Sequence, residues 1–212
     1  MAIMMASEDQ GVDAAQQLRA LSMTARGDAQ LRGQLGQNPL LLAGILHLLQ
    51  EGPDAARYWC CQCLVSLSHK HTDNQSAMAT FPGMMDAILE VLVEGSSLSR
   101  GAACSALVEC TFRNADNALL VAKKKGMMHG VVSVMQTSTG DVRDDAAGVL
   151  RNCSNYSQAA AEVIVQTPGV LDALIEMCKG ENSERFTAMG TIQNLTRCES
   201  VAPLLCKTRV VA

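Results

Sequence analysis

Aromatic side chains are scarce in this sequence, which has one Trp, two Tyr and three Phe among its 212 residues. A β-sandwich core usually contains more aromatic and β-branched residues, so this scarcity argues against that fold class. Hydrophobic residues nevertheless make up 48% of the chain, including 12 Met and nine Cys. The core must therefore consist mainly of aliphatic, Met and Cys side chains, a composition that suits stacked helices.

The chain also lacks an excess of basic residues and a long apolar run. Its formal net charge is −4 and its pI is about 5.5, so it has no basic footprint for general nucleic-acid binding. No segment reaches the ~18 apolar residues of a membrane span, and the longest candidate, residues 40–49, contains His47. Residues 1–6 are short and lack the basic start of a signal peptide, and nine Cys without such a signal indicate a reducing compartment. We therefore expect a cytoplasmic protein, with the nucleus as a second location, no nucleic-acid partner and no membrane span.

Motifs of the common enzyme classes are missing as well. The sequence contains no G-x-S-x-G, no P-loop, no H-E-x-x-H and no Gly-rich dinucleotide-binding turn. We therefore expect a non-enzymatic protein without a cofactor.

One group of residues has the chemistry of a zinc site: Cys60, Cys61 and Cys63, followed by His69 and His71. On a continuous helix, however, Cys60 and His69 would lie about 13 Å apart along the axis, too far to share one ion. Buried Cys behaves as a small hydrophobic residue. The sequence therefore predicts that these cysteines belong to the core and that the chain has no metal site.

The most informative feature is an internal repeat with a period of about 43 residues. One set of equivalent residues consists of glycines that interrupt the helical pattern: Gly83, Gly126 and Gly169. A second set consists of apolar residues spaced 43, 43 and 42 residues apart: Leu64, Leu107, Leu150 and Ile192. Leu18 precedes Leu64 by 46 residues, so the first unit is slightly longer. Two independent sets with one period indicate a repeat architecture.

Each unit predicts three helices. Short helices are expected before the glycines, for example at residues 73–80 and 116–124. After each glycine, apolar residues recur at i, i+1, i+4 and i+8, which is one face of an amphipathic helix. A long third helix is expected to begin near residues 55, 98, 141 and 183, each time after a residue type that favours an N-cap: Asp54, Ser97, Gly140 and Asn182.

Two segments carry a resemblance to a known family. Ala146-Ala-Gly-Val-Leu-Arg-Asn-Cys-Ser154 and Met189-Gly-Thr-Ile-Gln-Asn-Leu-Thr196 resemble the third-helix motif of catenin-type armadillo repeats. The resemblance implies an all-α, right-handed α-solenoid of about four armadillo units with partial units at both ends. After a disordered segment at 1–7, a single array is expected with units at 8–27 (partial), 28–72, 73–115, 116–157, 158–199 and 200–212 (partial).

The resemblance to armadillo repeats also implies a binding function. Proteins of this family hold an extended peptide or a partner's helix in a concave groove of successive third helices, where an Asn on each helix contacts the ligand backbone. In this sequence the Asn position reads Ala20, Ser66, Glu109, Asn152 and Asn194. Only Asn152 and Asn194 match the family pattern. An alternative for both is a buried amide that bonds a neighbouring loop.

Other polar and aromatic residues of the third helices would face the same groove. They either select ligand side chains or form an ordinary solvated helix end. Together with the two Asn residues, the predicted peptide-binding residues are Asn152, Asn194, Asn155, Tyr156, Arg113, Arg197, Ser66, Gln62 and His69.

Two other functions remain as alternatives. Nuclear-transport adaptors of the importin-α type carry a Trp four residues before the Asn, and the residues found here argue against that function: Gln16, Gln62, Ser105, Gly148 and Gly190. The other alternative is a structural module that self-associates through an incomplete C-terminal end, where Val201, Leu204 and Leu205 would lack a complete neighbour. A chain cut from a longer protein would have the same unfinished end.

Two further features of the repeat lead to expectations. The arginines at equivalent positions, Arg57, Arg100, Arg143 and Arg185, could hold an acidic peptide. Each lies seven residues before a buried apolar residue, so we favour bonds to carbonyl groups at the end of the preceding helix or pairing with a neighbour. Cys198 aligns with polar and aromatic residues and is expected to be the most exposed thiol.

Overall fold

The computed structural model of the chain describes residues 8–180, 182–201 and 203, and these form thirteen α-helices and no strand. The chain divides into two compact units, residues 1–110 (unit 1) and 111–212 (unit 2). From here on, each set of three helices is called a repeat. The segment at 1–7, for which the sequence predicts disorder, lies outside the described residues.

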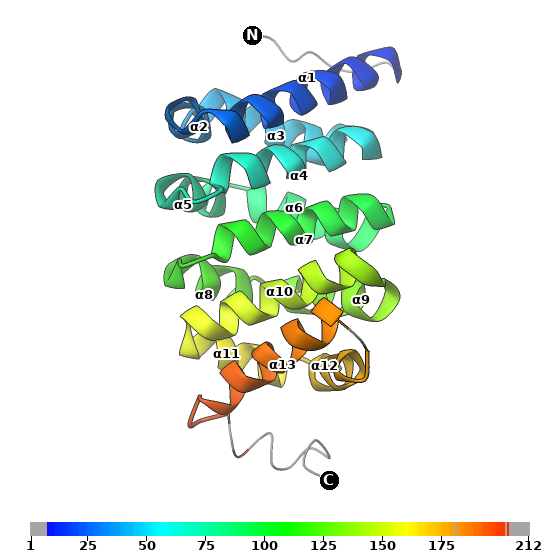
Figure 1. The fold of residues 1–212 in the computed structure, drawn as a ribbon. Helices are drawn as coiled ribbons and strands as arrows, with labels where there is room; N and C mark the ends of the chain where they lie inside the picture. The colour runs from blue at the N-terminus through cyan, green and yellow to red at the C-terminus, as the bar shows by residue number, and fades with distance from the viewer. Residues whose placement is uncertain (1–7, 181, 202, 204–212) are drawn as a thin grey trace. The chain divides into compact units, whose positions relative to one another are not determined.

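The helices repeat in the order short, amphipathic and long (Figure 1). The first helices of the repeats are α2 (Ala29–Gly36), α5 (Thr72–Thr80), α8 (Ala115–Lys123) and α11 (Gln158–Gln166). The second helices are α3 (Pro39–Glu51), α6 (Met84–Glu94), α9 (Met127–Thr137) and α12 (Val170–Cys178). The third helices are α4 (Asp54–Ser68), α7 (Ser97–Thr111), α10 (Gly140–Tyr156) and α13 (Asn182–Thr196), and α1 (Glu8–Gly27) is their N-terminal equivalent.

Helix boundaries agree with the sequence pattern to within one residue. The short helices predicted at 73–80 and 116–124 are α5 and α8, and each third helix begins one residue earlier than predicted. The four predicted N-caps are therefore wrong, because each is already the first helical residue: Asp54, Ser97, Gly140 and Asn182. Pro53 and Thr139 are the N-cap residues of α4 and α10.

The glycines that define the repeat have a backbone conformation that other residues avoid. Gly83, Gly126 and Gly169 have φ of +84°, +86° and +79°, and each directly precedes a second helix. A side chain in this left-handed region costs roughly 1–2 kcal/mol, so glycine suits the sharp turn. The first repeat has no such glycine, and there Asn38 caps α3 by accepting hydrogen bonds from the amides of Leu40 and Leu41.

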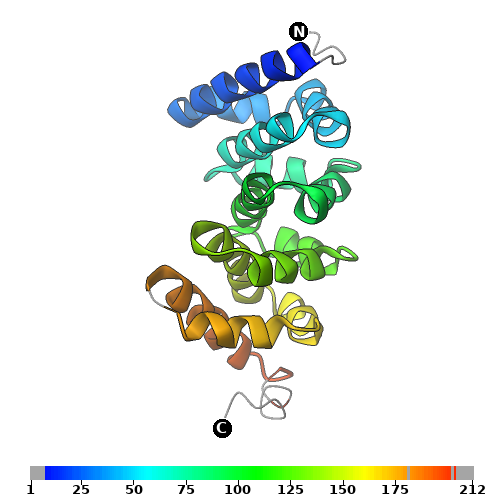
Figure 2. The same ribbon diagram turned by 90° about the vertical axis from the view of Figure 1, so that its right-hand side faces the viewer.

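Third helices pack side by side within each unit, with the second helices forming a layer behind them (Figures 1 and 2). In unit 1, α1 lies along α4, and in unit 2, α10 lies along α13. Small residues of the third helices are buried where the helices pack, and Cys60, Ala146 and Ala188 have no exposed surface. Among the predicted apolar positions, Leu150 is fully buried, whereas Ile192 is only half-buried.

The cysteines predicted to lie in the core do so. Cys60, Cys61 and Cys63 have no exposed surface, and burial raises the pKa of Cys61 and of Cys63 to about 12. Among the described residues, no three His, Cys, Asp or Glu side chains are placed to hold a metal ion.

Two expectations for the C-terminal end are wrong. Cys198 is buried, because the chain turns after α13 and the amide of Val201 bonds back to the carbonyl of Cys198. The same turn buries Val201 completely, although the sequence predicts that it lacks a neighbour. Of the thiols described, only that of Cys178 is partly exposed. Leu204 and Leu205 lie outside the described residues.

In the part of the chain that the structure describes, no single helix has both the length and the hydropathy to cross a membrane. The pair α5 and α6 passes that test together, with a bend of 81° between the two helices.

The burial of the cysteines predicts an order of thiol reactivity. In the folded protein, Ellman's reagent should modify Cys178 before Cys60, Cys61 and Cys63, because only the thiolate reacts. Burial raises the pKa of Cys60 well above its usual value and the pKa of Cys61 and of Cys63 to about 12, so little thiolate forms at about pH 8. Peptide mass spectrometry after brief labelling assigns each modified residue. In unfolded protein, the control, all of them should react. Labelling of Cys60, Cys61 or Cys63 in the native protein as fast as Cys178 would contradict the core assignment.

Candidate functional site

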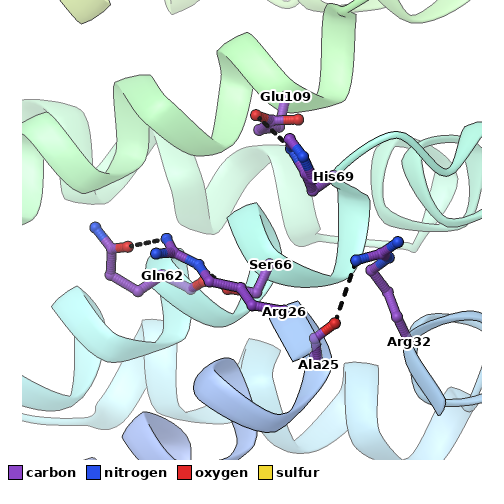
Figure 3. Close-up of polar contacts among 7 residues, drawn as sticks. All are labelled: Ala25, Arg26, Arg32, Gln62, Ser66, His69 and Glu109. Atoms are coloured by element: carbon purple, nitrogen blue, oxygen red, sulfur yellow. Dashed lines mark hydrogen bonds and ion pairs between the residues drawn. The ribbon is translucent and has the colours of Figure 1, made fainter. Parts of the chain in front are cut away.

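The third-helix surface of unit 1 is occupied by contacts within the chain (Figure 3). Arg26, near the end of α1, donates from Nε to Ser66 Oγ at 3.0 Å and from Nη2 to Gln62 Oε1 at 3.4 Å. The hydroxyl of Ser66 is also 2.7 Å from that of Ser22, and Ser66 is buried. The side chains of Ser66 and Gln62, two predicted binding residues, are thus held by their own chain.

His69, the third predicted binding residue of unit 1, also has an internal partner. Its Nδ1 lies 3.1 Å from Glu109 Oε1, and Figure 3 shows the two side chains facing each other. Glu109 stands at the position where the resemblance predicts an Asn. The predicted ligand-facing side chains of unit 1 therefore have partners within the chain.

Unit 2 places five of the predicted residues on, or directly after, two neighbouring third helices. Asn152, Asn155 and Tyr156 lie on α10, Asn194 lies on α13, and Arg197 follows α13 directly. They line two adjoining pockets that share Asn155 and Asn194. One pocket, of about 210 Å³, is lined by Phe112, Arg151, Asn152, Asn155, Tyr156, Gly190, Gln193 and Asn194. The other, of about 180 Å³, is lined by Ser154, Asn155, Gln158, Asn194, Arg197 and Cys198.

Hydrogen bonds orient the two Asn side chains in these pockets. Asn194 donates from Nδ2 to the carbonyl of Arg151 at 3.2 Å, which links α13 to α10. Asn152 donates from Nδ2 to Thr111 Oγ1 at 3.4 Å. Both amides are half-buried, and the two partners named here belong to helices.

Aromatic rings form one wall of the larger pocket. The rings of Phe112 and Tyr156 meet edge to face, with centroids 6.3 Å apart and an interplanar angle of 87°. The guanidinium of Arg113, the sixth predicted residue in unit 2, lies 5.3 Å from the centroid of Phe112. This contact places a cation beside the pocket on a fixed ring face.

Arg151 is a site residue that sequence reasoning misses. Its guanidinium lies 5.6 Å from the centroid of Phe186 on α13. A Cβ atom at Gly190 would lie 3.1 Å from Arg151 Nε, so glycine at this position leaves room for the side chain. The sequence signal that could have identified Arg151 is a pair of positions in neighbouring repeats: an Arg next to the Asn of one repeat and a Gly in the next repeat.

Comparison with solved structures shows the fold class of this arrangement. A designed armadillo repeat protein in complex with the peptide (KR)4 matches with a TM-score of 0.75, over 97% of this chain and 93% of that one, at 16% identity. This chain has the armadillo-repeat fold. Computationally designed armadillo repeat proteins for modular peptide recognition match with a TM-score of 0.76, over 94% of this chain and 84% of that one, at 14% identity. UNC-45 from Drosophila melanogaster matches with a TM-score of 0.77, over 98% of this chain but 26% of its own, at 15% identity.

The solenoid architecture predicted from the sequence is thereby confirmed. No family model matches the sequence, and no curated protein matches it either.

Three of the four recurring arginines of the armadillo repeats bond the ends of second helices. Arg57 donates from Nε to the carbonyl of Gly52 at 3.1 Å and from Nη2 to that of Gln50 at 2.8 Å, at the end of α3. Arg100 Nε donates to the carbonyl of Leu92 in the last turn of α6 at 3.0 Å. Carbonyl groups at a helix end lack partners within the helix and carry partial negative charge, so a guanidinium stabilises them.

The same position in unit 2 follows this pattern with one variation. Arg185 Nε donates to the carbonyl of Gly180 at 2.9 Å, just beyond α12. Arg143 instead pairs with Glu184 at 3.6 Å, and Glu184 also accepts a hydrogen bond from the amide of Gly140. The structural role favoured for these arginines is confirmed.

A stability measurement checks this role for Arg57. Arg57→Ala should lower the free energy of unfolding by about 1–3 kcal/mol, because two carbonyl groups at the end of α3 lose a charged donor. Arg57→Lys should recover only part of the loss, since an ammonium group lacks the planar fork that reaches both carbonyls. Urea unfolding followed by circular dichroism gives the values.

Lys123→Ala is the matched control, because it removes an exposed positive charge and should change the free energy of unfolding by less than about 0.5 kcal/mol. If Arg57→Ala were as stable as the wild type, the assignment of this arginine to helix ends would be refuted.

Proposed function

We propose that unit 2 is a peptide-binding module that holds an extended segment of a partner protein along α10 and α13. The proposal rests on the two adjoining pockets that share Asn155 and Asn194. Asn152 lines one of these pockets and Arg197 lines the other. The likeness to designed armadillo proteins for peptide recognition supports this proposal. In this role the chain is a non-enzymatic scaffold of the cytoplasm.

The chemistry of the two Asn side chains suits a peptide backbone. A carboxamide offers two N–H donors and a carbonyl acceptor, which match the carbonyl and N–H of a peptide group. At Asn194, one donor already bonds the carbonyl of Arg151, so the side chain is oriented before the ligand arrives. An extended ligand advances about 3.3 Å per residue and directs alternate side chains to one face. Its side chains would then enter the two pockets while Asn152 and Asn194 hold its backbone.

A nuclear-transport adaptor is less well supported. The positions where such adaptors carry Trp are Gly148 and Gly190 in unit 2, and the single Trp of the chain, Trp59, lies on α4 of unit 1 beneath the guanidinium of Arg19. Self-association through the C-terminal end is also less well supported, because Val201, which the sequence predicts to lack a complete neighbour, is buried.

Selection from a random peptide library tests the proposed function. A phage-displayed library panned on the intact chain should enrich peptides that bind the wild type. Asn152→Ala/Asn194→Ala should bind the selected peptides at least about tenfold more weakly, because two hydrogen bonds to the ligand backbone are lost. Fluorescence anisotropy with the labelled peptides gives the affinities.

Gln136→Ala/Gln166→Ala serves as the matched control, since it removes two exposed amides from α9 and α11. It should leave binding unchanged, and circular dichroism should show that both double variants fold like the wild type. If the Asn double variant binds as tightly as the wild type, the ligand does not lie on α10 and α13. If no peptide is enriched, unit 2 is not a peptide-binding module.

A further inference from the structure

The two pockets of unit 2 have a charge that differs from that of the whole chain. Arg151 lines the larger pocket and Arg197 lines the smaller, and Arg113 lies on the Phe112 ring at the edge of the larger one. No Asp or Glu among the described residues lines either pocket. The net charge of the chain is −4, so the positive charge here is local.

No acidic side chain among the described residues pairs with these three arginines. Within the described residues, Arg113, Arg151 and Arg197 form no ion pair. In contrast, the arginines at helix ends bond carbonyl groups or Glu184, as Arg57 and Arg143 show. The guanidinium groups at the pockets are therefore available to a ligand.

Arg151 is held in a defined position. Its guanidinium carbon lies over the Phe186 ring, 5.6 Å from the centroid, and Gly190 leaves the space that Nε and Cδ of Arg151 occupy. A guanidinium in this position can still offer its N–H edge for a planar, bidentate bond to a carboxylate. Because the side chain is already restrained, binding loses less conformational entropy than at a free arginine.

From these observations we infer that the α10–α13 surface selects an acidic ligand, an extended segment whose Asp or Glu side chain bonds the guanidinium of Arg151. Arg197 and Arg113 add positive charge on either side of this contact. The inference rests on the proposed function, since Asn152 and Asn194 hold the backbone of the same segment. It adds the chemical class of the ligand.

Three synthetic peptides test the selection. They alternate Thr with Glu, with Gln or with Lys, so that they differ in charge and share an extended preference. Fluorescence anisotropy on the intact chain should show the Glu peptide binding at least about tenfold more tightly than the Gln peptide, and the Lys peptide binding most weakly. The preference for Glu should shrink as salt is added, because salt screens exposed charges.

Variants separate the geometry of Arg151 from its charge. Arg151→Gln should abolish the preference for Glu over Gln. Arg151→Lys should retain only part of it, because it keeps the charge and loses the planar fork. Gly190→Ala removes no charge and adds a good helix former, yet should weaken binding of the Glu peptide by crowding Arg151. Lys123→Gln, the control, makes the same charge change as Arg151→Gln at an exposed site outside the pockets and should have no effect.

The outcomes distinguish this inference from the function on which it rests. Tighter binding of the Glu peptide that depends on Arg151 supports the inference. Equal binding of the Glu and Gln peptides, or tightest binding of the Lys peptide, overturns it and leaves peptide binding intact. Equal losses in Arg151→Gln and Lys123→Gln overturn it too, because the attraction would then be unspecific. Failure of all three peptides to bind overturns acidic selection, whereas the library decides whether unit 2 binds peptides at all.

Discussion

The close approach of neighbouring third helices is the constraint on which each unit depends. In unit 2, α10 packs against α13, and each of these helices buries a small residue completely, Ala146 on α10 and Ala188 on α13. The two helices therefore come near enough for Asn194 to bond the carbonyl of Arg151. Gly190, on the same helix as Ala188, gives the Arg151 side chain its space. A larger side chain on these faces would separate the helices and disperse the groups that line the pockets.

The two units place different side chains on the same kind of helix surface. In unit 1, Arg26 reaches Ser66 and Gln62, and His69 faces Glu109, so the polar groups bond within the chain. In unit 2, the corresponding surface presents Asn and Arg side chains to two pockets. Function in repeat proteins depends on the surface residues that the common frame displays. The contrast between the units supports assigning ligand binding to unit 2.

Periodicity was sufficient to predict the features that recur in every repeat. A residue's place within its own repeat predicts the turn glycines, the buried cysteines and the arginines that bond helix ends. Arg151 could not be predicted in this way, because its position depends on Phe186 and Gly190 in the next repeat. The bond between Arg26 and Ser66 was missed for a similar reason. Arg26 belongs to α1, and the spacing from α1 to the next repeat differs from the regular period. Cys198 was misplaced because periodicity cannot show how the chain turns after α13.

The central claim is that the α10–α13 surface of unit 2 receives the ligand. Its most direct test is a two-dimensional ¹H–¹⁵N spectrum of the labelled protein, recorded as the alternating Glu–Thr peptide is added. The side-chain amide signals of Asn152 and Asn194 and the Nε–H signal of Arg151 should shift together and saturate at the same peptide concentration. Saturating shifts confined to unit 1, with those three signals unchanged, would contradict the account.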